Sequence, residues 1–384
     1  MAFRDILTAA AVCLSLAASP AFAQSLRPDT ERAIDQAMGA SIESGWAAGG
    51  AVAVMRGGEV VFSRGYGMAN LETGTPVSPD TVFRIGSLTK QFTAAAILLL
   101  CEDGLISLDD PVARHLPRFD QQDSTTIRQL LNHTAGLVDY PDRAGFRERE
   151  MWLPLTTGQL VDYVLSAAPL HEFEPGSRWS YSSSNYVVAG AVVEAVSGQP
   201  LGAFLEARIF GPLGMANTAL DDPRAVVSGR ATGYDRARVE EPGFLNARAI
   251  SMSAPFAAGA MRSTMPDLLR WSHALTHGRV LEPESYREMT TPARLSDGSP
   301  AYALAPDGTR HPISYGLGLA TPDGPGPVRL GHDGAIDGFT ALVTTYLDQD
   351  LTLAVAVNTS PSDRLPFDAI VQAVEAEILE RPAP

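Results

Sequence analysis

Strand-like segments at both ends of the chain enclose a long stretch with helical periodicity, and this order restricts the fold strongly. Residues 28–43 repeat apolar residues at helical spacing, and residues 49–67 predict a β-hairpin with its turn at residues 56–59. Near the other end lie four strand-like runs and a final helix: YGLGLAT (315–321), VRLGHDG (328–334), FTALVTTYL (339–347), LTLAVAV (351–357) and residues 366–379. We expect the terminal segments to meet in one sheet.

Between these ends, apolar residues recur every three or four positions, as in helices: QFTAAAILLLCEDG, TIRQLLNHT, TGQLVDYVLSAA, NYVVAGAVVEAVSG and MPDLLRWSHALTHG. The prediction is an α/β (α+β) fold in which an antiparallel sheet, flanked by the N- and C-terminal helices, carries a large all-helical inserted lobe. Residues 24–384 then form one catalytic domain, with an α/β lobe at about 27–86 and 300–384 and a helical lobe at about 87–299. Long connections at 138–155 and 291–327 are expected to edge a cleft between the lobes or to be mobile.

The first 23 residues have the composition of a signal peptide. A short charged start precedes an apolar run from Ile6 to Ala18, and the small-residue site Ala-Phe-Ala ends before Gln24. A lipoprotein site at Cys13 is the rival interpretation, but a bulky residue precedes it. We expect a periplasmic or secreted protein with no membrane span, because no later segment has about 20 consecutive apolar residues.

Charge and histidine spacing exclude several kinds of partner. The net charge is −15, whereas nucleic-acid binding normally needs a basic face, so we expect no nucleic acid. The seven histidines show no HExxH, HxH or CxxC-like spacing, and His273 and His277, one helical turn apart, lack a third ligand. We therefore expect no metal and no cofactor, and a small molecule or peptide as the substrate. The oligomeric state stays open.

Lys90 is the only lysine among 29 basic residues. Arginine serves wherever a fixed positive charge is enough, but only lysine can lose its proton, so a single lysine indicates a base or proton shuttle. Ser87 precedes it by three residues at the start of a predicted helix, so the two side chains can meet. Lowering the pKa of Lys90 from about 10.4 to near 7 requires burial. Alternatively, Ser87 only caps the helix and Lys90 is solvated.

Two further motifs accompany this pair: Tyr181-Ser182-Ser183 before a helical run and His332-Asp333-Gly334 in a predicted strand. In this order the three motifs resemble the active site of the serine β-lactamase and penicillin-binding protein superfamily. The likeness is greatest to the branch of class C β-lactamases, D-alanyl-D-alanine carboxypeptidases and family VIII esterases. Connecting strings also match: VFRIGSLTK, LLNHTAGL, EPGSRWSYSSSNY, FGPLGM, AAGAMRST and GHDGAIDGF. The resemblance implies a two-lobed β-lactamase/transpeptidase-like fold.

The resemblance also implies roles for the motif residues. Ser87 would be the acylated nucleophile, Lys90 its proton acceptor, and Tyr181 a proton shuttle to the leaving group or the deacylating water. His332 would lie near Tyr181 and the substrate. Gly334 would belong to the third-motif strand, and the backbone N–H groups of Ser87 and Ala335 would form the oxyanion hole.

Two positions depart from the family pattern. Ser183 stands where the family usually has Asn, which shortens the reach of a substrate-binding side chain, and the register favours Ser183 over Asn185 for this position. The third motif is His-Asp-Gly where β-lactamases mostly have Lys-Thr-Gly, and Asp333 adds a negative charge near the expected position of a substrate carboxylate. His133, in LLNHTAGL, is interpreted as a buried residue that shapes a neighbouring loop.

The expected function is a secreted serine hydrolase that forms an acyl-enzyme on Ser87. The expected substrates are D-alanyl peptides, such as peptidoglycan stem peptides, cleaved in the manner of a DD-carboxypeptidase, or related amides. Alternatives are a carboxylesterase or class C-like β-lactamase of the same fold, and a penicillin-binding sensor with little turnover.

Overall fold

The computed structural model describes residues 25–238, 241–305, 307–320 and 327–380. The predicted signal peptide, residues 1–23, lies outside these ranges, so export stays a prediction. Among the described residues, no single helix has the length and apolar character needed to cross a membrane, although the bent pair Ser183–Ser197 and Leu201–Leu213 passes this test when taken together.

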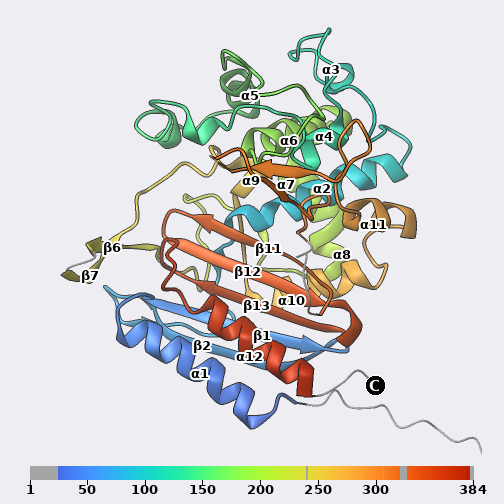
Figure 1. Ribbon diagram of the computed structural model, residues 1–384. Coiled ribbons are helices and arrows are strands. Elements are labelled where there is room, and N and C mark those ends of the chain that lie inside the picture. The colour runs from blue at the N-terminus through green and yellow to red at the C-terminus, as the bar shows by residue number, and fades with distance from the viewer. Residues whose placement is uncertain (1–24, 239–240, 306, 321–326, 381–384) are drawn as a thin grey trace, which may run out of the picture.

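A six-stranded antiparallel sheet brings the two ends of the chain together (Figure 1). The strand order is β11 (Arg329–Ile336), β12 (Phe339–Tyr346), β13 (Leu351–Val357), β1 (Gly49–Arg56), β2 (Glu59–Asn70) and β3 (Thr75–Pro76). β1 and β13 are neighbours, with Ala53 opposite Ala354, so the predicted pairing of the terminal segments is confirmed. The predicted hairpin is also present, since β1 ends at Arg56 and β2 begins at Glu59.

The two faces of the sheet carry different side chains. Helices α1 (Pro28–Glu43) and α12 (Phe367–Glu380) cover one face, where Val52 and Val54 pack against Ile34 and Ile370. The alternate residues of β1, including Ala53, belong to the core of the inserted region. Small side chains on this inner face allow α10 (Met265–Thr276) to pack against β13 and β1.

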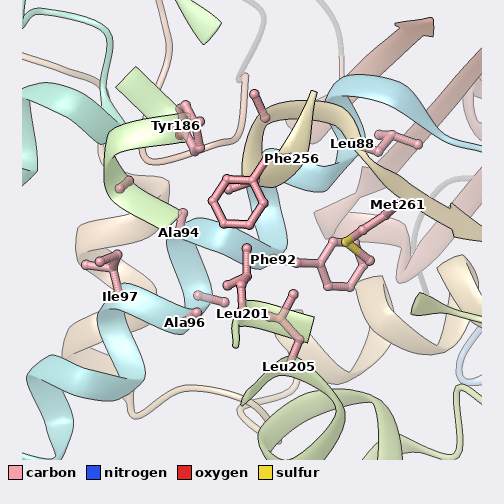
Figure 2. Packing of buried hydrophobic residues seen from close by; sticks show 14 of the residues in the cluster. Leu88, Phe92, Ala94, Ala96, Ile97, Tyr186, Leu201, Leu205, Phe256 and Met261 are labelled. Atoms are coloured by element: carbon pink, nitrogen blue, oxygen red, sulfur yellow. The ribbon is translucent and has the colours of Figure 1, made fainter. Parts of the chain in front are cut away.

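The inserted region is built around two buried helices, α2 (Thr89–Glu102) and α6 (Ser183–Ser197). Figure 2 shows Phe92 of α2 in a cluster with Tyr186, Leu201, Phe256 and Met261. The other helices of the insertion are α3 (Val112–His115), α4 (Ile127–Leu131), α5 (Thr157–Leu165), α7 (Leu201–Leu205), α8 (Gly211–Leu213), α9 (Phe256–Gly259) and α11 (Pro283–Thr290). The predicted helices of this region are therefore confirmed, with slightly shifted ends.

The expectation of an all-helical insertion needs one correction, because short strands lie within it. β4 (Phe83–Arg84), β8 (Met261–Ser263) and β5 (Ala219–Leu220) form a small sheet, and β6 (Tyr234–Arg238) pairs with β7 (Glu241–Asn246). The strands β4, β5 and β8 have only two or three residues, too few for an alternating pattern to be recognised in a sequence. A further small hairpin joins β9 (Tyr302–Leu304) and β10 (Arg310–Pro312).

The strand predicted at residues 315–321 is wrong over its described part, 315–320. Only isolated bridges occur there, between Tyr315 and Ala320 and between Ala320 and Gly331. Gly318 has φ +74°, and a Cβ at this position would lie 2.8 Å from the carbonyl oxygen of Lys90. Glycine thus allows this segment to turn tightly against α2 instead of extending as a strand.

The buried carboxylate of Glu377 links the terminal helices to the sheet through hydrogen bonds. Glu377 of α12 is fully buried, and it accepts hydrogen bonds from the hydroxyl of Thr30 (2.7 Å), from Arg27 (3.1 Å) and from Arg56 of β1 (3.1 Å). Its pKa is lowered despite burial, because these donors favour the charged form. The network connects α1, α12 and β1.

Glu377→Ala should lower the free energy of unfolding by about 3–5 kcal/mol, because the arginines would lose a buried partner. Glu380→Ala, at an exposed partner of Arg27, is the control and should cost about 0–1 kcal/mol. Urea denaturation of both variants at pH 7 checks this, and equal losses would contradict the assigned role of Glu377.

Candidate active site

Ser87 and Lys90 meet at the start of the central helix. Ser87 lies in the 3₁₀ turn η1 (Gly86–Leu88), which leads directly into α2. Lys90 is in the first turn of α2, and its Nζ lies 3.1 Å from the Ser87 Oγ. The predicted meeting of the two side chains is therefore observed, at a distance suited to proton transfer.

Lys90 is completely buried, unlike most lysines. Its Nζ donates a hydrogen bond of 2.8 Å to the carbonyl oxygen of Ala258. Burial lowers the pKa of Lys90 to about 7, although the charges of Asp139 and Asp333 act in the opposite direction. At neutral pH a large share of the Lys90 amine is uncharged and able to accept a proton. This environment rules out the solvated-lysine alternative.

Tyr181 lies beside this pair. The Lys90 Nζ is 4.8 Å from the centre of the Tyr181 ring, and the phenol hydrogen-bonds with Ser87. Burial raises the pKa of Tyr181 above its ordinary value, while the Ser87 hydrogen bond acts against this shift. The hydroxyl therefore stays protonated at neutral pH and can donate a proton to a group beside Ser87.

His332 is buried on β11, and both ring nitrogens have partners. Nε2 lies 2.9 Å from the hydroxyl of Tyr315, and Nδ1 hydrogen-bonds with the backbone oxygen of Asp333. Burial, and then the charge of Lys90, lowers the pKa of His332 to about 4, so the ring is neutral at pH 7. Its ring centre is 6.2 Å from that of Tyr181. The structure thus places His332 near Tyr181, as predicted, and the hydrogen bond with the Tyr315 hydroxyl orients the His332 ring.

His133 fits its interpretation as a buried residue that shapes the site. Its Nδ1 accepts a hydrogen bond of 3.2 Å from the backbone N–H of Ser182, and its ring centre lies 4.4 Å from that of Tyr181. Burial lowers the pKa of His133 well below its ordinary value. The neutral ring of His133 packs against the ring of Tyr181.

Two glycines bring β11 against the turn that carries Ser87. A Cβ on Gly334 would lie 2.0 Å from the backbone oxygen of Ile85, and a Cβ on Gly86 would lie 2.7 Å from the backbone nitrogen of Ala335. Gly86 also has φ +51°, which favours glycine. The backbone at Ser87 and at Ala335 therefore converges as an oxyanion hole requires, although the role itself stays a prediction.

A cleft opens beside Ser87. Ser183 and Ala335 also line it, whereas Asn185 is fully buried, with its Nδ2 3.2 Å from the Nδ1 of His133. This placement agrees with the register chosen for Ser183. The remaining lining residues are Tyr140, Pro141, Phe146, Arg147, Met151, Ile250, Ala254, Pro255, Ala258, Gly259, Ile336, Asp337 and Pro361. The connection at 138–155 thus edges the site, as expected.

Asp333 does not line this cleft. It is exposed and lines a separate hollow together with Asp368 and Val371 of α12, because alternate residues of a strand face opposite sides. Asp333 therefore lies outside the cleft beside Ser87, where a substrate would bind. Its charge still acts on Lys90 at a distance.

Asp139 is a residue that the motifs did not predict. Its Oδ1 accepts a hydrogen bond of 2.7 Å from the backbone N–H of Ser183 at the start of α6, and its charge acts on Lys90 and Tyr181. Burial raises the pKa of Asp139 to about 6, while the Ser183 N–H and the Lys90 charge lower it. Nothing in the sequence around Asp139 (LVDY) or around Ser183 (YSSS) indicates that the two segments lie side by side in the fold. Tyr315 was missed for the same reason.

The sequence indicated no third ligand for His273 and His277, but the structure places a possible one beside them. The structure brings Asp350 to them from the turn before β13, and the three possible ligand atoms lie within 4.8 Å of one another. This cluster is separate from the cleft.

If neutral Lys90 accepts the Ser87 proton, acylation of Ser87 should rise with pH through about 7 and then level off. Asp139→Asn removes a charge that raises the pKa of Lys90, so this limb should move to lower pH, while Asn keeps an acceptor for the Ser183 N–H. Stopped-flow acylation by p-nitrophenyl acetate measures the profile. The exposed Asp363→Asn is the control, and an unmoved limb in Asp139→Asn would contradict the coupling.

Comparisons with known proteins agree with this geometry. The profile of the beta-lactamase family matches residues 30–377. Penicillin-binding protein 4* of Bacillus subtilis is 28% identical over 347 residues, 87% of this chain and 73% of that protein. D-aminopeptidase of Brucella anthropi is 31% identical over 313 residues, 81% of this chain, which spans only 56% of that relative.

Solved structures show the same fold. The D-amino acid amidase from Ochrobactrum anthropi SV3, complexed with L-phenylalanine amide, has a TM-score of 0.77 at 27% identity, over 91% of this chain and 99% of that one. Together with the paired Ser87 and Lys90, these matches identify the chain as a serine hydrolase that belongs to the beta-lactamase family.

Proposed function

We propose that this serine hydrolase cleaves D-aminoacyl amides that carry an apolar side chain and a free α-amino group, through an acyl-enzyme on Ser87. The observation that carries the proposal is the composition of the cleft beside Ser87. Most of its lining residues are apolar, its charged lining residues are Asp337 and Arg147, and the partly buried Asp139 accepts a hydrogen bond from the backbone N–H of Ser183, another lining residue.

The apolar wall suits the side chain of an acyl donor. Tyr140, Phe146 and Met151 of the 138–155 connection, together with Ile250 and Ile336, surround the space next to the nucleophile. Burying an apolar side chain among them releases about 25 cal/mol for each Å² removed from water. Substrates with aromatic or large aliphatic side chains should therefore bind best.

Charge favours an amine over a carboxylate near the nucleophile. A carboxypeptidase must hold a terminal carboxylate, but the third motif offers only the neutral ring of His332. Lys90 is hydrogen-bonded to Ser87 and is not available for a substrate carboxylate. Arg147 is then the cation among the lining residues, and the charge of Arg147 already acts on Asp337. An α-ammonium group would be attracted by Asp337 and Asp139. D-Alanyl peptides with a free carboxylate remain the alternative substrate.

The D configuration is inferred from relatives. D-aminopeptidase and D-amino acid amidase are named for such substrates, and the second aligns over nearly its whole length. Since this chain spans about half of the D-aminopeptidases it matches, their activity is carried over only as a proposal.

Acylation follows from the geometry. The Ser87 Oγ would attack the substrate carbonyl while Lys90, 3.1 Å away, accepts its proton. The backbone N–H groups of Ser87 and Ala335 would stabilise the oxyanion, and Tyr181 would give a proton to the departing amine. Lys90 would then return its proton through Tyr181.

Deacylation would use the same groups in reverse. Water in the cleft would attack the acyl carbonyl and pass its proton through Tyr181 to the neutral Lys90 amine. The departing Ser87 oxygen would then take a proton back from Lys90, which regenerates the free enzyme. His332 and His133 would position the Tyr181 ring and exchange no proton, since both are neutral and buried.

Lys90→Arg should lower the acylation rate about a thousandfold, because arginine keeps the charge but cannot serve as a base. Stopped-flow acylation by p-nitrophenyl acetate measures the loss. Ser87→Ala should abolish acylation altogether and serves as the reference. A rate near that of the wild type in Lys90→Arg would mean that Lys90 acts only as a fixed charge.

D-Phenylalanine p-nitroanilide should show a kcat/KM at least about tenfold higher than its N-acetyl derivative, a preference of about 1.4 kcal/mol. Asp337→Asn should reduce this ratio, whereas the exposed Asp363→Asn should not. Faster cleavage of the N-acetylated substrate, or of N-acetyl-D-alanyl-D-alanine, would favour the carboxypeptidase alternative.

Two other outcomes would replace the proposal. Rapid turnover of p-nitrophenyl esters without amide cleavage would identify an esterase. A stable penicillin adduct on Ser87 without hydrolysis of D-aminoacyl amides would identify a penicillin-binding sensor, and fast adduct loss a β-lactamase.

A further inference from the structure

Three segments that are distant in sequence meet at the end of α10 farther from Ser87. His273 lies in the last turn of α10, His277 directly follows the helix, and Asp350 lies between β12 and β13. The turn between β1 and β2 is also close, since the backbone N–H of Gly57 donates to the backbone carbonyl oxygen of Asp350 (2.9 Å). A Cβ on Gly58 would lie 3.0 Å from the His273 Nε2.

The separations of the possible donor atoms fit one small cation. The His273 Nδ1 is 3.7 Å from Asp350 Oδ1, and the His277 Nε2 is 3.4 Å from Asp350 Oδ2. Zinc bonds of about 2.0–2.1 Å to nitrogen and oxygen place neighbouring ligand atoms of a tetrahedron about 3.4 Å apart. Little movement is needed to reach that geometry.

A neighbouring hydrogen bond orients His277 as a ligand. Its Nδ1 lies 2.9 Å from the backbone oxygen of His273, and because a carbonyl only accepts, Nδ1 carries the hydrogen. The lone pair is then on Nε2, which faces the Asp350 carboxylate. Two acceptors 3.4 Å apart repel unless a cation or proton lies between them. Metal-binding histidines are typically oriented by such a bond.

We propose that His273, His277 and Asp350 bind a divalent transition-metal ion of the zinc class. Imidazole nitrogens favour zinc over magnesium or calcium, and a fourth coordination position would be taken by water. The ion would join α10 to the β12–β13 turn.

The role of this site is structural. α10 begins shortly after Ala258 and Gly259 of the cleft, and its 12 residues span about 18 Å, so the ion would lie at the opposite end of the helix. It would hold the inserted region against the sheet without contact to the substrate. Sequence spacing alone could not suggest this, because Asp350 belongs to another lobe.

The test titrates zinc chloride into tag-free, chelator-treated protein by calorimetry and follows the melting temperature. We expect one zinc ion per chain and a Tm higher by about 3 °C in excess zinc. His277→Ala and Asp350→Asn, at partly exposed positions, should each weaken binding at least about tenfold. His311→Ala, an exposed histidine on β10, should leave binding unchanged.

Absence of stoichiometric binding, or equal binding in the double variant His277→Ala/Asp350→Asn, would overturn the proposal and leave the cluster as an ion pair. Hydrolysis of p-nitrophenyl acetate should be unaffected by chelation. A rate that depends on zinc would overturn the structural role.

Discussion

The rest of the active site depends on the burial of one amine. An isolated ammonium group without contact to water is strongly disfavoured, so Lys90 is accommodated by a lowered pKa and by two partners, Ser87 and Ala258. The protein removes water from Lys90 by placing it in a helix whose residues are buried almost throughout, between α6 and α9. The hydrophobic packing in Figure 2 is therefore also a condition for the chemistry.

The same burial explains why the neighbouring groups are neutral. Tyr181, His133 and His332 share the desolvated space around Lys90, and in each the uncharged form is favoured. Two carboxylates bring negative charge to this region. Asp139 accepts a hydrogen bond from the backbone N–H of Ser183, and Asp333 lies on the outer face of β11. These two carboxylates oppose the effect of burial on Lys90 and keep its pKa near the pH at which a base works best.

Local pattern was enough to predict the sheet, its flanking helices and the pair at 87 and 90, because these depend on periodicity and on a spacing of three residues. Longer-range features were not predictable. Asp139 meets α6, Tyr315 meets His332, and Asp350 meets His273 through the tertiary fold alone. Residues 315–320 were predicted as a strand because glycine and leucine alternate there. In the fold, Gly318 instead allows the backbone to pass close to the backbone of Lys90.

The cleft also explains how a chain with Ser183 in place of the family's Asn can still organise its site. An Asn side chain would reach Lys90 and the substrate at once, which Ser is too short to do. Here the Ser183 N–H holds Asp139, and the carboxylate supplies the polar partner whose charge acts on Lys90. Because a negative charge repels a substrate carboxylate and attracts an α-ammonium group, the charge of Asp139 acts in the direction of the proposed preference for aminoacyl substrates.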